Sequence, residues 1–352
     1  MEKLIVSCSP HISEKHKGTR RIMLDVIIAL VPALVAATVI FGYHVIINAF
    51  FSVLFCAASE TLFCLIKSRE FNREGLKKAS TSDLSCVVTG LILALNLPAT
   101  MNVWGLNITY GDRVVFSFDT VLACLIGSIV AIVLVKELFG GIGRNFANPA
   151  LTARAFLFLT FATAFVSSAP AFDTATSATW LTSGRPAADG TLLLNMFLGV
   201  RGSAATGEAC VIALAIGYIY LSIRRVIDFR VPLMIIGWTA VFALLFDGLI
   251  KQQLTGSQLL LNAASHVLSG GLIFGAIFMA TDYATSPNTF AGNCIFAFGI
   301  ALLTVLIRVF ASYPEGVSFA MLIMNCVTPL IDRYVYPRPM GYAKEGKREE
   351  RK

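Results

Sequence analysis

Apolar residues fill most of the chain in long runs, and short polar stretches separate one run from the next. The runs at 22–41, 114–135 and 293–310 are each near the ~20 residues that a helix needs to cross the hydrocarbon core of a membrane. Strands of a membrane β-barrel would alternate apolar and polar residues, and these runs do not. The pattern therefore predicts an all-α polytopic membrane protein rather than a barrel or one large soluble core.

Ten segments are apolar enough to be expected as transmembrane helices, and the longest polar stretch, 169–207, separates them into two groups of five. They lie near residues 22–41, 44–66, 83–98, 114–135, 147–168, 208–222, 231–247, 266–280, 292–310 and 315–332. Because five is an odd number, a second copy of the same unit enters the membrane upside down, and inverted repeats are typical of transporters. The expected division is a tail at 1–21, a five-helix repeat at 22–168, an outer loop at 169–207, a second repeat at 208–332 and a basic tail at 333–352.

Lys and Arg are distributed unevenly among the polar stretches. Of the 28 such residues, 22 lie in the two tails and in the loops after the second, fourth and sixth segments, and four lie on the opposite side. Since cytoplasmic loops carry the excess of positive charge, both termini are expected in the cytoplasm, which requires an even number of spans. The net charge of +7 comes mostly from this asymmetry, so the basic tails are expected to meet anionic lipid and not nucleic acid.

The composition agrees with a membrane protein and argues against metal centres held by this chain alone. Hydrophobic residues make up 56% of the chain and charged residues only 14%, against about a quarter charged in a typical soluble domain. The eight cysteines are scattered without any CxxC pair, so an iron–sulfur cluster, a haem or another metal site held by this chain alone is not expected. The histidines His11, His16, His44 and His266 are isolated in the sequence and receive no role.

Two of the ten segments, the third and the eighth, are about 15 residues long, against the ~20 needed to cross. The third ends at Pro98, and Pro287 follows the eighth. Short, proline-interrupted segments at matching places in two repeats indicate broken helices around a central site. Tilted or re-entrant helices without a ligand are the alternative.

One motif in the outer loop carries specific chemistry. Residues 173–179 read DTATSAT, which resembles D-x-x-[S/T]-G-A-T, the flavinylation signal of the bacterial sodium-pumping and Rnf-type redox complexes. In those proteins a separate flavin transferase joins the last Thr to the phosphate of FMN. The positions that this resemblance assigns to the cofactor are Asp173, Thr176, Ser177, Ala178 and Thr179, with Thr179 at the attachment position and Ser177 where the family often has Gly. A Ser- and Thr-rich loop with one Asp is otherwise an ordinary solvated loop.

Further segments are similar to the same family, from Ser9-Pro10-His11 to residue 338. They include GGIGRNFANPA at 140–150 and YPEGVSFA at 313–320. The chain is identified as a member of the family that contains the D subunit of the Rnf complex and the B subunit of the sodium-pumping NADH:quinone oxidoreductase. The short N-terminal tail and the segment 313–320 favour the Rnf branch, whereas Asn148–Phe156 favours the other.

The resemblance implies a function as well as a fold. It implies a subunit, not catalytic alone, of a ferredoxin:NAD⁺ oxidoreductase complex in the bacterial inner membrane that exports Na⁺ or H⁺. The implied cofactors are covalent FMN and, as in the sister enzyme, riboflavin as a second flavin; the implied partners are the A, B, C, E and G subunits of the Rnf complex and the flavin transferase. No GxGxxG follows a strand, in agreement with a subunit that does not itself bind NAD. A channel or transporter for a small solute and a purely structural subunit are the alternatives from other classes.

Charges within the membrane are costly and often functional. Arg154 lies about 10 Å into the fifth segment, where it can pair with a flavin phosphate or a carboxylate, or extend toward the headgroups. Glu60, Asp83 and Asp282 are candidates for an ion route. Asp83 and Asp282 are expected at the ends of the two short segments and on opposite sides of the membrane, although Asp83 is also a plausible helix cap. Arg308 is expected to form a structural pair with Glu315.

Overall fold

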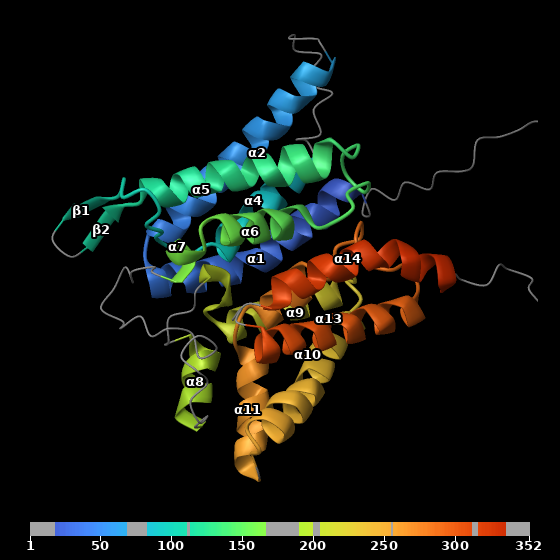
Figure 1. Ribbon diagram of the computed structural model, residues 1–352. Coiled ribbons are helices and arrows are strands. Elements are labelled where there is room, and N and C mark those ends of the chain that lie inside the picture. The colour runs from blue at the N-terminus through green and yellow to red at the C-terminus, as the bar shows by residue number, and fades with distance from the viewer. Residues whose placement is uncertain are drawn as a thin grey trace, which may run out of the picture.

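The computed structural model describes residues 18–68, 83–110, 113–166, 190–199, 205–254, 256–311 and 316–335. In these residues the chain is helical apart from one small hairpin, so the predicted all-α fold class is confirmed. Figure 1 shows the first half, coloured blue to green, packed beside the second half, coloured yellow to red.

The first half contains helices at all five predicted segments. They are α1 (Thr19–Phe41), α2 (His44–Ser68), α4 (Ser85–Asn96), α5 (Phe118–Ile129) continued by the π-helix η2 (Val130–Glu137), and α6 (Pro149–Thr160) followed by α7 (Ala162–Val166). The hydrophobic pattern predicts that the fourth segment begins at residue 114, but strand β2 (Arg113–Phe116) occupies that position and pairs with β1 (Ile108–Tyr110). This antiparallel hairpin projects from one edge of the molecule (Figure 1).

The second half repeats the pattern. Its helices are α9 (Val211–Ile223), α10 (Arg230–Phe242) continued by the π-helix η4 (Ala243–Lys251), α11 (Ser257–Leu268), α12 (Leu272–Phe278), α13 (Phe290–Phe310) and α14 (Gly316–Tyr334). The predicted start of the eighth segment is too late, because α11 begins at Ser257 and meets α12 across a break with a bend of 50°. Two further elements, α8 (Gly190–Leu198) and the 3₁₀-helix η3 (Thr206–Glu208), lie in or next to the stretch expected as a loop.

Five of the described helical stretches are long and apolar enough to cross a membrane alone: α1, α2, α5 with η2, α10 with η4, and α13. The bent pair α11 and α12 makes a sixth if it counts as one span. The helices α4, α6 and α9 are apolar but have only 12 or 13 residues, short of the ~20 needed to cross. The count of ten crossings therefore stays a prediction.

Local sequence explains where several helices begin. The side chains of Ser117, Asn148 and Thr289 accept hydrogen bonds from backbone N–H groups in the first turns of α5, α6 and α13. Such capping satisfies donors that have no partner inside the helix. Pro149 stands at the start of α6, where its missing N–H costs nothing.

Helices at equivalent places in the two halves make equivalent contacts. In the first half α2 packs against α4 and α5, and in the second α10 packs against α12 and α13. The pairs α4–α6 and α12–α14 are likewise in contact, and α1 lies along α9 to join the halves. The described helices thus follow a repeat of one five-part unit.

The equivalent short helices α4 and α12 run in opposite directions. Asn96, at the end of α4, is bound to Arg154, and Arg154 pairs with Glu208, which lies against Gly271 at the start of α12. At the other ends, Ser85 of α4 and Asp282 after α12 line one cavity. Antiparallel equivalent helices are what inverted repeats require.

Candidate functional site

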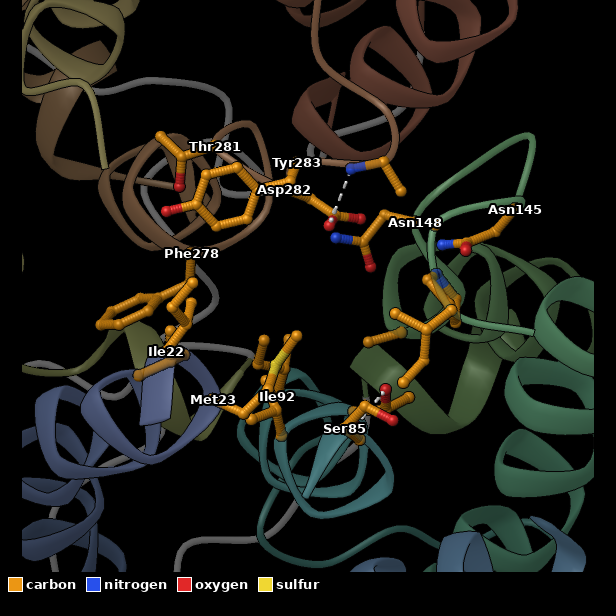
Figure 2. A pocket seen from close by; sticks show the side chains of 18 of the residues that line it. Ile22, Met23, Ser85, Ile92, Asn145, Asn148, Phe278, Thr281, Asp282 and Tyr283 are labelled. Carbon is orange, nitrogen blue, oxygen red and sulfur yellow. Dashed lines mark hydrogen bonds between the residues drawn. The ribbon is translucent and has the colours of Figure 1, made fainter. Parts of the chain in front are cut away.

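A cavity of about 320 Å³ lies between the start of α4 and the end of α12. The N-terminal part of α1, the loop before α6 and the turn between α9 and α10 complete its wall. The wall is mainly apolar, and polar groups enter it at a few points. Figure 2 shows this ring of side chains, with Ile22, Met23, Ile92 and Phe278 among the apolar groups and Asn145, Asn148, Thr281 and Asp282 among the polar ones.

The glycine-rich loop between η2 and α6 forms one side of the cavity. Gly140, Gly141 and Gly143 have φ angles of 111°, 89° and 80°, which residues with a Cβ rarely adopt. The loop can therefore turn back sharply and bring Asn148 to the wall, where its side-chain N–H donates to the carbonyl oxygen of Met279 at 3.4 Å. The motif GGIGRNFANPA thus has a direct structural role in shaping the cavity.

A buried ion pair stands beside the cavity. The Nζ of Lys136 lies 2.8 Å from Oε2 of Glu60 in α2 and donates to Oγ of Ser85 at 2.7 Å. The sequence places Lys136 among the cytoplasmic loop charges, and this prediction is wrong: Lys136 lies within η2 with 3% of its side chain exposed. The Oε1 atom of Glu60 is buried without a hydrogen-bond partner in the described part of the chain.

Asp282 lies in the turn after α12 and its side chain faces the cavity (Figure 2). Burial raises the pKa of its carboxyl, and hydrogen bonds from the Ala284 N–H and the Thr285 hydroxyl partly oppose this rise. The expectation that Asp83 and Asp282 face opposite sides is wrong. Asp83 precedes Ser85 by two residues, and Ser85 lines the same cavity as Asp282, because α4 and α12 are antiparallel.

Arg154 lies in the middle of the protein and not at its surface. Its guanidinium donates to Oε1 of Glu208 at 3.0 Å and to Oδ1 of Asn96 at 2.7 Å, with 4% of its side chain exposed. Of the alternatives that the sequence leaves open, the structure shows the carboxylate pair, and the extended path to the headgroups is excluded by burial. The sequence does not indicate that Glu208 is the partner of Arg154, since it stands 54 residues away at the first position of the sixth predicted segment.

The second half contains its own buried charged cluster. Asp247, in η4, accepts at Oδ2 from Nε2 of His266 at 2.9 Å, and both side chains are fully buried. Arg308 donates to the backbone carbonyl oxygens of His266, Ser269 and Gly270. His266 receives no role from the sequence because its partner stands 19 residues away, and the pairing of Arg308 with Glu315 lies outside the described residues.

The expected flavin attachment segment, including Asp173, Thr176, Ser177, Ala178 and Thr179, also lies outside the described residues. Its assignment rests on the sequence alone.

The size and the lining of the cavity are those of a site for a small, largely apolar molecule. Sites for small molecules have volumes of about 300–1,000 Å³ and combine apolar walls with a few placed polar groups. Here aliphatic and aromatic side chains form the faces, and the amides of Asn145 and Asn148 and the hydroxyl of Thr281 can bind polar atoms at a ring edge. These residues fit a non-covalently bound flavin ring.

The fold and the cavity define a polytopic helical membrane protein made of two inverted repeats around short central helices. More narrowly, the chain belongs to the NQR2, RnfD, RnfE family, whose profile matches residues 5–116 and 119–341.

Several relatives match nearly the full chain. The D subunit of the Na(+)-translocating ferredoxin:NAD(+) oxidoreductase complex of Acetobacterium woodii is 39% identical over 97% of this chain and 96% of its own. A proton-translocating counterpart from Clostridium ljungdahlii is 33% identical over 96% of both chains. The D subunit of the ion-translocating oxidoreductase complex of Actinobacillus succinogenes is 32% identical over 97% of this chain and 99% of its own.

Proposed function

We propose that this chain is the membrane flavin subunit of an ion-translocating ferredoxin:NAD⁺ oxidoreductase complex and couples electron transfer to the export of Na⁺ or H⁺. The observation that carries the proposal is full-length similarity to the D subunits of such complexes, at 39% identity for the Acetobacterium woodii protein. The buried charges around the central cavity agree with it, because intramembrane charges mark ion and proton paths.

Two flavins are proposed, FMN bound covalently to Thr179 and riboflavin in the cavity between the start of α4 and the end of α12. A flavin supplies one-electron and two-electron redox chemistry, and the protein supplies its position and environment. In the cavity, Ile92 and Phe278 would hold the ring faces and keep out water, while Asn145 and Asn148 would orient its polar edge. In the outer segment the Thr179 hydroxyl is the oxygen to which a phosphate can be joined.

The ion route is proposed to use the acids that the structure brings to one end of the short helices. Glu60, held by Lys136, and Asp282 and Asp83 at the ends of α12 and α4 lie at or beside the cavity. Moving one charge against 100 mV requires about 2.3 kcal/mol, which a modest drop in redox potential supplies. The two relatives named for their ion differ, one for Na⁺ and one for protons, so family membership does not decide between them.

The proposed location is the bacterial inner membrane, with both termini in the cytoplasm and residues 169–207 outside. The partners there would be the A, B, C, E and G subunits of the complex and, during maturation, a flavin transferase. A cysteine introduced at Ala188 should react with a membrane-impermeant thiol reagent in intact cells of an otherwise unreactive strain. Labelling only after permeabilisation would show the opposite orientation.

In-gel fluorescence tests the proposed function most directly. The chain is purified from a host that contains the flavin transferase, denatured in SDS and illuminated. A covalently bound flavin survives this treatment and gives a fluorescent band, whereas a channel or a solute transporter gives none. Measuring reduction of NAD⁺ by ferredoxin in the assembled complex then separates this function from that of a quinone oxidoreductase.

A further inference from the structure

The buried clusters of the two repeats occupy matching positions. Lys136 stands 18 residues after Phe118, the first residue of α5, and Arg308 stands 18 residues after Phe290, the first residue of α13. Glu60 and Asp247 are likewise 16 and 17 residues after the starts of the equivalent helices α2 and α10. Each repeat therefore buries an acid and a base near the start of its short helix, and in the first repeat Glu137 adds a second acid 4.0 Å from Lys136.

The two clusters differ in one respect that matters chemically. In the first repeat the acid is paired with the amino group of Lys136 at 2.8 Å. In the second repeat the acid is hydrogen-bonded to an imidazole, the side chain whose ordinary titration falls near neutral pH. The second cluster and the cavity lie at opposite ends of α13. Asp282, which lines the cavity, comes shortly before the first residue of α13, whereas Arg308 is near the last residue of that helix.

We propose that Asp247 and His266 form a proton-binding site at that opposite end of the membrane domain. The site takes up a proton from water to form imidazolium beside carboxylate, and it returns the same proton to water when it discharges. Nε2 of His266 lies 2.9 Å from Oδ2 of Asp247, and beside an ionised carboxylate it must be the donor, so Nδ1 is the atom that would gain and lose the proton. The inference rests on the proposed coupling to ion export and adds to it a site that titrates.

The surroundings stabilise the charged carboxylate in both states of the histidine. Oδ2 of Asp247 also accepts from Nε2 of Gln252 at 3.1 Å and from Nδ2 of Asn262 at 3.0 Å. Asn262 is 2% exposed, and its Oδ1 is buried without a partner in the described residues, so an acceptor remains inside the cluster for a water or a hydronium proton. Asp247 lies in a π-helical segment, a form that is rare and is found frequently at functional sites.

The exposed end of η4 is the surface nearest to the cluster along the chain. Asp247 is four residues before Lys251, roughly 6 Å along a helix, and Gln252 continues the hydrogen bonding into the following loop. Among the described residues, Arg308 from α13 and Lys251 from η4 bring charge to the site, and Nζ of Lys251 donates to the Val309 carbonyl. The other described helices packed on α11, namely α8, α10 and α12, contribute only Arg230, at the far end of α10.

The test uses the whole complex in proteoliposomes, with ferredoxin-driven reduction of NAD⁺ and ion transport measured together. In wild type the ratio of ions moved to electrons transferred should change several-fold between about pH 6 and 8, where imidazole titrates. His266→Gln cannot be charged and His266→Lys stays charged, so both should give a ratio that is independent of pH. The matched control is His44→Gln, which removes a buried histidine whose Nε2 contacts the Val114 carbonyl and should leave the wild-type profile.

A His266→Gln or His266→Lys profile that superimposes on wild type would overturn the inference, and so would a flattened profile in the His44→Gln control. If neither His266 variant assembles, the protonation of the His266 ring is followed instead by infrared difference spectra of the His44→Gln complex with isotope-labelled histidine. A ring that changes protonation on turnover supports the site, and no labelled signal overturns it. A wild-type complex without bound flavin or without any ion transport would instead refute the proposed function, and that outcome is visible in the same vesicles.

Discussion

Glu60 and Lys136, which are 76 residues apart in the sequence, meet at 2.8 Å between Oε2 and Nζ in a part of the protein that is closed to solvent. Removing one partner of a buried ion pair leaves an uncompensated charge, and the loss of stability is typically about 3–5 kcal/mol. Lys136→Met should therefore shorten the thermal half-life of the purified protein sharply. Adding Glu60→Gln should restore part of it, because the carboxylate that lost its lysine is then neutral.

Lys251→Met is the control for loss of a lysine, since Lys251 lies at the exposed end of η4. If Lys136→Met is as stable as this control, the Glu60 carboxylate is not held by its lysine.

Gly271 has φ of 67° and lies so close to the Arg154–Glu208 pair that an added Cβ would overlap Oε1 of Glu208. Gly271→Ala should therefore displace Glu208 from Arg154 and destabilise the protein by about 1–3 kcal/mol, through backbone strain and overpacking. Gly256→Ala is a matched control, because Gly256 has φ of 64° but open space around its Cβ position. Equal thermal half-lives for the two variants would mean that the contact with Glu208 is unimportant.

The raised pKa of Asp282 predicts a dependence of stability on pH. The folded protein binds this proton more tightly than the unfolded chain, so wild type loses stability as pH rises from the ordinary Asp pKa toward the raised one. Asp282→Asn has no such loss. The stability of the variant relative to wild type should therefore increase with pH across that window and be constant below it, as measured by thermal half-life. A difference that does not vary with pH would contradict the effect of burial on this carboxyl.

Asp83→Asn and Asp282→Asn should lower ion transport more than they lower flavin content. Both acids stand at the end of the short helices where the cavity lies, so each is placed to meet an ion there. Transport is measured in reconstituted vesicles and flavin by fluorescence of the same preparation. Unchanged transport in both variants would remove the two acids from the ion route.

Thr179→Val should abolish covalent flavin and electron transfer while the protein still inserts and assembles. The substitution keeps the β-branched shape and deletes the oxygen to which the FMN phosphate would be joined. The neighbours Thr174, Thr176 and Ser177 also carry hydroxyls, so their unmodified state in wild type is the internal control. Peptide mass spectrometry of residues 169–185 detects modification of Thr179 and of its neighbours in one measurement. An FMN-sized adduct on another residue would show that Thr179 is not the attachment site.

The hydrophobic pattern predicts where most of the described helices lie, because burial in lipid requires long apolar runs whatever the details of packing. It cannot locate the break between α11 and α12, since the glycines Gly270 and Gly271 interrupt an apolar run without changing its hydropathy. It also misses the hairpin β1–β2, whose apolar residues Val114 and Val115 resemble the start of α5.

The sequence predicts which residues belong to the candidate site better than it predicts which of them are in contact. Glu60, Arg154 and Asp282 stand out in the sequence because a charge in or next to an apolar segment is rare. Their partners do not stand out: Lys136 lies so near a helix end that it resembles a loop residue, and Glu208 lies at the boundary between a polar stretch and an apolar segment. The equal spacing of Lys136 and Arg308 from the starts of their helices is a usable signal, and it becomes visible only when the two repeats are aligned helix by helix.

The π-helical segment η2 makes the position of Lys136 tolerant of the loss of one residue. From Val130 to Glu137 the backbone hydrogen bonds span five residues instead of four, so this segment holds more residues per turn than an α-helix. Deleting one residue between Val130 and Val135 would allow the segment to relax to α-helical geometry. Because a π-helical turn holds about one residue more than an α-helical turn, the deletion removes the extra residue and leaves the lysine on the side of Glu60. The same deletion within α5 would rotate Lys136 by about 100°, so a single-codon deletion should spare the ion pair only where it falls in η2.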